Sequence, residues 1–149
     1  FRDEYGDYCD DMAAKGPGMI ISAYEPEKIS AEEWESITEY VFDIYADAMT
    51  PLLLITASDL EDVPMELHQC TYLTDYRTAI ALNRSNGGAT LIDDGEIICK
   101  WPARSLPDAD NLATINEKNS IELMAGRAPR GRIFFEGLMV YSLAVLLIL

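Results

Sequence analysis

Apolar positions along the first half of the chain follow first the spacing of a buried strand and then that of a helix. Residues 19–22 (MIIS) and 52–56 (LLLIT) are short continuous apolar runs, which are typical of buried parallel strands. Between them, large apolar side chains recur every three or four positions and acidic residues lie off this stripe. The pattern predicts an amphipathic helix over residues 31–49, which begins at a capping box of Ser30 and Glu33 and ends before Pro51.

The second half of the chain predicts a shorter helix and a hairpin. Residues 58–69 form a short helix or loop that Pro64 limits, and Thr74-Asp75 can cap a helix that runs to about Asn83. Two β-rich runs, 89–92 and 96–101, flank an Asp-Asp-Gly turn in which Gly95 supplies positive φ. The order strand, helix, strand, helix, hairpin predicts an α/β fold with parallel strands followed by an antiparallel pair.

The entry to this hairpin resembles the last hairpin of a thioredoxin-like domain. A helix end with the sequence Arg84-Ser85-Asn86 leads through Gly87-Gly88 into the first strand. We therefore expect a thioredoxin-like mixed sheet flanked by helices. The resemblance also implies a cis-proline just before the first hairpin strand, facing redox cysteines. Gly87 occupies that position here.

The sequence of residues 74–107 also resembles that of a group of bacterial membrane proteins. These proteins join a DoxX-type four-helix membrane region to a thioredoxin-like domain and a last transmembrane helix. The resemblance extends more loosely over most of residues 1–107 and implies that the chain is the C-terminal part of a longer protein. It places this domain outside the cytoplasm, in the periplasm. The matching residues are Thr74, Asp75, Arg84, Ser85, Asn86, Gly88, Gly95, Lys100, Trp101, Leu106 and Pro107.

The chain ends in an apolar segment. Residues 133–149 carry one charge, Glu136, and are close to the length of about 20 residues that a membrane span needs. We expect a C-terminal apolar helix that spans the membrane; the alternative is a buried strand or helix of a soluble domain. The organisation is then a leading segment (1–15), the thioredoxin-like domain (16–110), a linker (111–132) and the apolar helix (133–149).

Charge narrows the choice of partner and of membrane side. The chain has 26 acidic and 11 basic residues and a net charge of −15, which argues against binding nucleic acid. We expect as partners another membrane or extracytoplasmic protein, and the lipid bilayer through residues 133–149. The basic run Arg127, Arg130 and Arg132 by itself favours the cytoplasmic side, which is the alternative location.

The cysteines argue against a redox dithiol. Cys9, Cys70 and Cys99 are far apart in the sequence, and the loop after the first strand, residues 23–29, contains no thiol. Cys99 alternates with Ile97 and Trp101 and is predicted to be a small core residue on their face of the strand. Cys70 is the candidate for an exposed, reactive thiol.

Other catalytic constellations are equally weak. His68 is the only histidine, and neither acidic cluster, 59–62 or 93–96, has the loop pattern of a calcium site. We expect no catalytic residue, cofactor or metal site, so the sequence favours a protein that is not an enzyme. Three function classes follow: a membrane-tethered thioredoxin-like module that binds a partner or assists an attached DoxX-type region, an oxidoreductase accessory domain that uses a single thiol (Cys70 or Cys9), and an acidic inhibitor or immunity-type protein.

Overall fold

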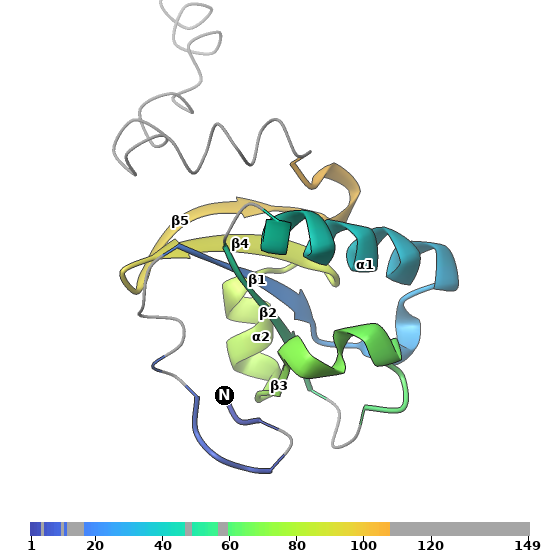
Figure 1. The fold of residues 1–149 in the computed structure, drawn as a ribbon, viewed down its shortest axis with the longest axis horizontal. Helices are drawn as coiled ribbons and strands as arrows, with labels where there is room; N and C mark the ends of the chain where they lie inside the picture. Colours follow the sequence, from blue (N-terminus) through green and yellow to red (C-terminus); the bar gives the residue numbers. More distant parts are fainter. Residues whose placement is uncertain (4, 10, 12–16, 47–48, 57–59, 108–149) are drawn as a thin grey trace, which may run out of the picture.

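One mixed sheet forms the centre of the molecule. The computed structural model describes residues 1–3, 5–9, 11, 17–46, 49–56 and 60–107, and its sheet has the strand order β3-β2-β1-β4-β5 (Figure 1). β1, β2 and β3 are parallel, whereas β4 is antiparallel to both β1 and β5. The predicted parallel pair and the predicted hairpin are both confirmed. The strands are β1 (Gly18–Ala23), β2 (Thr50–Ile55), β3 (Thr71–Leu73), β4 (Gly88–Asp93) and β5 (Glu96–Trp101).

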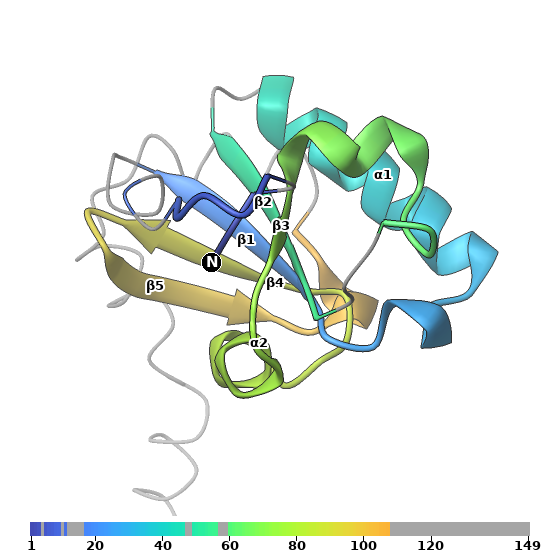
Figure 2. The same cartoon turned by 90° about the horizontal axis from the view of Figure 1, so that it is seen from below.

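Helices cover both faces of this sheet (Figure 2). The long helix α1 (Ala31–Ala46) and the 3-10 helix η3 (Met65–Cys70) lie over one face, and α2 (Tyr76–Leu82) lies over the other. Because side chains alternate along a strand, each strand contributes to two cores. Met19 and Leu53 belong to the core under α1, while Ile20 and Leu52 belong to the core on the opposite face.

The predicted capping box starts α1. The Ser30 amide donates to Glu33 Oε2 at 2.9 Å, and the Glu33 amide donates to Ser30 Oγ at 3.3 Å. The described part of α1 runs to Ala46, Met49 is no longer helical, and Pro51 lies inside β2. A proline is tolerated there because β3 pairs with β2 only from Leu53 onward, so one side of β2 is unpaired at Pro51.

The leading segment contributes to the edge of the sheet, which the sequence pattern did not predict. Arg2 exchanges two main-chain hydrogen bonds with Leu73 of β3, at 2.8 and 2.7 Å. The ring of Phe1 packs edge-on against Tyr72, with 5.6 Å between the ring centroids. These contacts extend the core on the α2 side beyond the edge strand.

A β-bulge in the hairpin corrects the predicted faces of β5. Leu91 pairs with Cys99, but the next residue, Ile92, pairs with Ile97, so Ile98 is the extra residue. The alternation of side chains is interrupted at that point. Ile98 and Cys99 are therefore both buried under α1, whereas Ile97 is 44% exposed and does not share the face of Cys99.

Several predictions concern residues beyond Pro107. The linker (111–132) and the apolar C-terminal helix (133–149) lie outside the described residues. Within the part of the chain that the structure describes, no helix is both long and apolar enough to cross a membrane. The remaining described elements are two short 3-10 helices, η2 (Pro26–Lys28) and η4 (Ala103–Ser105).

Candidate functional site

The loop after β1 is held against the segment between α2 and β4. The side-chain amide of Asn86 bonds both main-chain groups of Glu25: its Nδ2 donates to the carbonyl at 2.8 Å, and its Oδ1 accepts from the Glu25 amide at 3.2 Å. Tyr24 Oη donates to the carbonyl of Arg84 at 3.0 Å. The thiol-free loop of the sequence prediction therefore lies directly beside the Arg84-Ser85-Asn86 segment.

Gly87 differs in backbone from the proline that the resemblance implied. Its peptide bond with Asn86 is trans and its φ is +77°, a conformation that proline cannot adopt. Its amide donates to the carbonyl of Ser22 at 2.8 Å, a bond that requires an N–H group. A Cβ atom at this position would lie 3.0 Å from Ile37 Cδ1 of α1. Gly87 thus joins the end of β1 to the loop before β4 and lets α1 pack closely.

Asn83, which sequence reasoning treated only as a helix end, organises the other side of this loop. Its buried Nδ2 donates to the carbonyls of Ala89 and Trp101, at 2.8 and 2.9 Å, and its Oδ1 accepts from the Ser85 amide at 3.0 Å. Gly88 leaves room for this side chain, because a Cβ there would lie 2.8 Å from three Asn83 atoms. In the sequence, the only signal for this role of Asn83 was its position at the end of α2.

Most other residues that match the DoxX-type proteins in sequence have structural roles. Asp75 caps α2 by accepting from the Thr78 amide at 3.0 Å, and Thr74 bonds through its amide to the Ile55 carbonyl at 2.9 Å. Ser85 Oγ accepts from the Ala103 amide at 3.0 Å, and Lys100 Nζ donates to the Ala81 carbonyl at 2.8 Å. Gly95 supplies the predicted positive φ in the hairpin turn, and Trp101 packs at the border of the α1 core.

The surface above this clamped loop is aromatic and charged. Tyr24 and Tyr76 pack edge-to-face with 5.5 Å between ring centroids, and Tyr76 is 48% exposed. Lys28 and Glu25 form an ion pair at 2.6 Å, and Arg84, whose carbonyl accepts from Tyr24 Oη, is an exposed residue. We call Tyr24, Glu25, Lys28, Tyr76 and Arg84 the β1-loop surface. Rigid aromatic and arginine side chains are the residue types that protein interfaces favour.

The candidate thiol Cys70 lies away from this surface. It ends η3, is half-buried, and its Sγ contacts the Leu67 carbonyl at 3.2 Å. Burial raises the pKa of the Cys70 thiol above its ordinary value, which disfavours the reactive thiolate at neutral pH. Cys9 packs against the core on the α2 side, and Cys99 is buried as predicted. All three cysteines are described, and none is in a disulfide.

The histidine contacts the main chain of the turn before η3. His68 Nε2 lies 2.9 Å from the Val63 carbonyl, a contact that fixes the turn before η3. Within the described ranges, no group of three or more His, Cys, Asp and Glu side chains could hold a metal ion.

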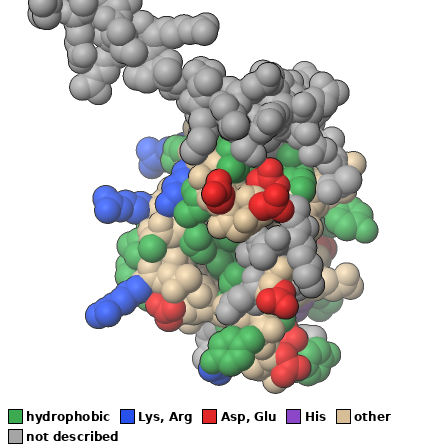
Figure 3. Space-filling view, turned by 90° about the vertical axis from the view of Figure 1, so that its left-hand side faces the viewer, with side chains coloured by type: hydrophobic (Ala, Val, Ile, Leu, Met, Phe, Trp, Pro, Cys, Tyr) green, Lys and Arg blue, Asp and Glu red, His purple; other side chains and the backbone are tan. Residues whose placement is uncertain are grey.

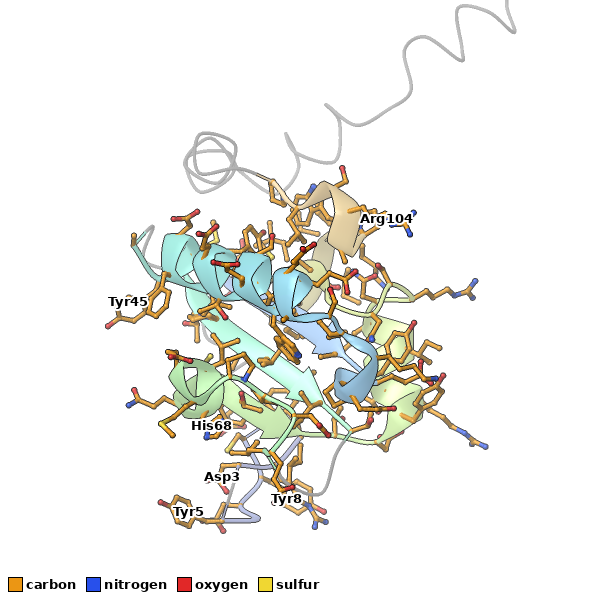
Figure 4. The ribbon with its side chains drawn as sticks, turned by 90° about the vertical axis from the view of Figure 1, so that its right-hand side faces the viewer. Asp3, Tyr5, Tyr8, Tyr45, His68 and Arg104 are labelled. Atoms are coloured by element: carbon orange, nitrogen blue, oxygen red, sulfur yellow. The ribbon has the colours of Figure 1, made fainter. Side chains whose placement is uncertain are left out.

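A second feature is a groove between α1 and η3, on the face opposite α2. Two adjoining hollows share Phe42 and Glu66 and extend from Trp34 near the start of α1 to Cys70 and Tyr72. Figure 4 views the molecule with this side in front, and the labelled Tyr45 lies at one end of the groove. We call it the α1–η3 groove.

Comparison with known proteins adds no assignment for either feature: no family model, curated protein or solved structure matches the chain.

Proposed function

We propose that this chain is a thioredoxin-like module without redox activity that binds a protein partner. The strand order, with a central β1 that is parallel to β2 and antiparallel to β4, supports the thioredoxin-like assignment. So does the placement of α1 and α2 on opposite faces of the sheet. The hairpin entry at Asn86-Gly87 beside the loop after β1 is the arrangement that the sequence resemblance implied.

The observation that carries a binding role is the rigid, thiol-free loop after β1. Where a redox thioredoxin-like protein needs an attacking thiolate and a resolving thiol, this chain has Tyr24, Glu25 and Pro26. Asn86 exchanges two hydrogen bonds with Glu25 of that loop, and Tyr24 Oη donates to the Arg84 carbonyl, so the loop is held against the segment before β4. A preorganised surface lowers the entropic cost of binding a partner, whereas it contributes nothing to thiol exchange.

The membrane part of the proposal comes from the sequence. The apolar segment 133–149 is proposed to anchor the module in the bilayer, with the domain on the extracytoplasmic side and beside a DoxX-type membrane region of the same protein. In that setting the partner is a membrane or extracytoplasmic protein, and the attached membrane region itself is one such partner. Alkaline carbonate extraction of membranes tests the anchor: the full chain is expected in the membrane pellet.

The alternative, an oxidoreductase accessory domain with one thiol, predicts fast alkylation. We expect the folded chain to react with iodoacetamide more slowly at Cys70 than free cysteine does at pH 7.5, because burial raises the pKa of this thiol. The variant Cys70→Ser identifies the contribution of Cys70 to the labelling. A Cys70 rate well above that of free cysteine would favour the oxidoreductase class.

Binding at the β1-loop surface is tested by site-specific photo-crosslinking. A photoreactive amino acid replaces the exposed Tyr76, and the matched control places it at the exposed Glu96, the first residue of β5. The full-length protein is crosslinked in its native membrane. A defined protein adduct at position 76 that is absent at position 96 is expected; equal adducts at both positions, or none, would contradict the proposed surface.

A further inference from the structure

The α1–η3 groove combines an apolar floor with an acidic rim. Trp34 and Val41 of α1, with Val63 and Pro64 before η3, contribute apolar side chains along its length. The hollow that ends at Tyr72 has a volume of about 420 Å³, which suits one or two large side chains of a ligand. The groove is separate from the β1-loop surface, because no residue lines both.

Large apolar side chains stand exposed along this groove. Phe42, which lines both hollows, is 56% exposed, and Tyr45 at one end is 74% exposed. Met65, at the start of η3, is 80% exposed but lines neither hollow. Phe42 and Tyr45 line the same hollow, so they form an exposed apolar pair rather than the isolated exposure that is normal on a surface. Aromatic and methionine side chains also match the composition of protein interfaces.

The rim of the groove has one sign of charge. The described residues that line it include no lysine or arginine, and α1 contains none over its whole length. Arg104, by contrast, lies near the far end of α1 from Tyr45 (Figure 4). In the view of the opposite end of the molecule, several Lys and Arg side chains project along one border (Figure 3). The acidic residues that line the groove are Glu35, Glu39, Glu61, Asp62 and Glu66.

We propose that the α1–η3 groove binds a basic segment of a partner protein, in which Lys or Arg residues flank one or two large apolar side chains. The apolar side chains of that segment would occupy the hollows beside Phe42 and Cys70, and its basic residues would face the acidic rim. Charge complementarity selects this occupant: an acidic rim repels nucleic acid, an anionic membrane surface and a second copy of this acidic groove. The inference deepens the proposed binding function by naming a second surface and the chemistry of its partner.

Fluorescence anisotropy on the full chain in a non-ionic detergent tests this inference. The probe is a short fluorescent peptide in which Lys and Arg alternate with Leu and Phe, and the control peptide has Glu in place of every Lys and Arg. We expect saturable binding of the basic peptide that weakens as the ionic strength rises, and no binding of the acidic peptide. Equal binding of both peptides would overturn the charge argument.

Variants locate the binding in the groove. The double variant Glu39→Lys with Glu66→Lys reverses two rim charges and is expected to lower the affinity for the basic peptide by about tenfold or more. Phe42→Ser should lower this affinity by a similar factor. The matched control Glu96→Lys changes another exposed acid, at the start of β5, and should leave the affinity within about twofold. If Glu96→Lys weakens binding as much as the groove variants do, the binding is unspecific attraction and the inference fails. Circular dichroism confirms that each variant is folded.

Two further outcomes are distinguishable. A peptide with the sequence of residues 127–135 of this chain (RAPRGRIFF) has the same basic and apolar character. If it binds more tightly than the designed peptide, the occupant is this chain and not a separate partner. If groove binding is absent while the crosslink at position 76 persists, the groove inference is overturned and the proposed function stands.

Discussion

The side-chain amide of Asn86 pairs with the main chain of Glu25 as a neighbouring strand would, donating to its carbonyl and accepting from its amide. The two residues are 61 positions apart, and no regular strand pairing exists at this point of the sheet. Asn86 therefore supplies by one side chain the hydrogen bonds that the loop after β1 cannot obtain from a strand. It makes this loop part of the rigid domain.

Replacing Asn86 by alanine should destabilise the domain. The variant leaves both main-chain groups of Glu25 without these partners in a partly buried position, which costs about 1–3 kcal/mol. The measurement is the free energy of unfolding from urea denaturation. Arg84→Ala is the control. It removes an exposed side chain and keeps the Arg84 carbonyl that accepts from Tyr24, so it should change the free energy of unfolding by less than about 0.5 kcal/mol.

Gly88→Ala tests the space that Asn83 occupies. The new methyl group would lie 2.8 Å from the Asn83 side chain, so a cost of about 1–3 kcal/mol is expected in chemical denaturation. In Gly18→Ala the new methyl group meets its neighbours at ordinary contact distances, 3.4 Å or more, and the cost should be smaller. In an Asn83→Ala background the clash is absent, so Gly88→Ala should cost less there. Additive effects of Asn83→Ala and Gly88→Ala would contradict the close approach.

The bulge in β5 predicts unequal effects of two neighbouring isoleucines. Ile98→Ala removes a side chain that is buried under α1 and should cost about 2–4 kcal/mol. Ile97→Ala removes a side chain that is 44% exposed and should cost less than about 1 kcal/mol. Thermal unfolding of both variants decides the register. A larger loss for Ile97→Ala would show that the strand alternates without a bulge.

The cap of α2 predicts a pH dependence of stability. Hydrogen bonds from Thr78 to Asp75 lower the pKa of this carboxyl below its ordinary value of 3.8. A lowered folded-state pKa means that the stabilisation is present above pH 3.8 and is lost as the pH falls through the folded pKa. In Asp75→Ala, stability should be lower at pH 7 and should fall less steeply between about pH 4 and pH 2. Urea titrations of both proteins across this range measure the difference, and parallel curves would contradict it.

Removal of residues 132–149 should leave a domain that unfolds cooperatively. The described residues already contain a five-stranded sheet with a hydrophobic core on each face. Calorimetry of the truncated chain is expected to show one transition, and carbonate extraction should release it from membranes. Loss of the cooperative transition would show that the C-terminal segment belongs to the core.

The sequence by itself determined the elements whose signals are local. The apolar runs 19–22 and 52–56 predicted β1 and β2, the stripe after Ser30 predicted α1, and the turn with Gly95 predicted the hairpin. In each case neighbouring residues determine the outcome, through side-chain periodicity, capping or backbone conformation. The mixed α/β sheet followed from the order of these elements.

Only the tertiary structure decided features whose partners are distant in the sequence. Nothing near Arg2 indicates that it pairs with Leu73, and nothing near Asn86 indicates that its amide bonds Glu25. The extra residue at Ile98 is likewise set by how β5 packs against β4 and α1 rather than by its own apolar pattern. The α1–η3 groove exists because two elements from different parts of the chain lie on one sheet face. Such long-range contacts depend on how assembled surfaces fit, which local periodicity does not encode.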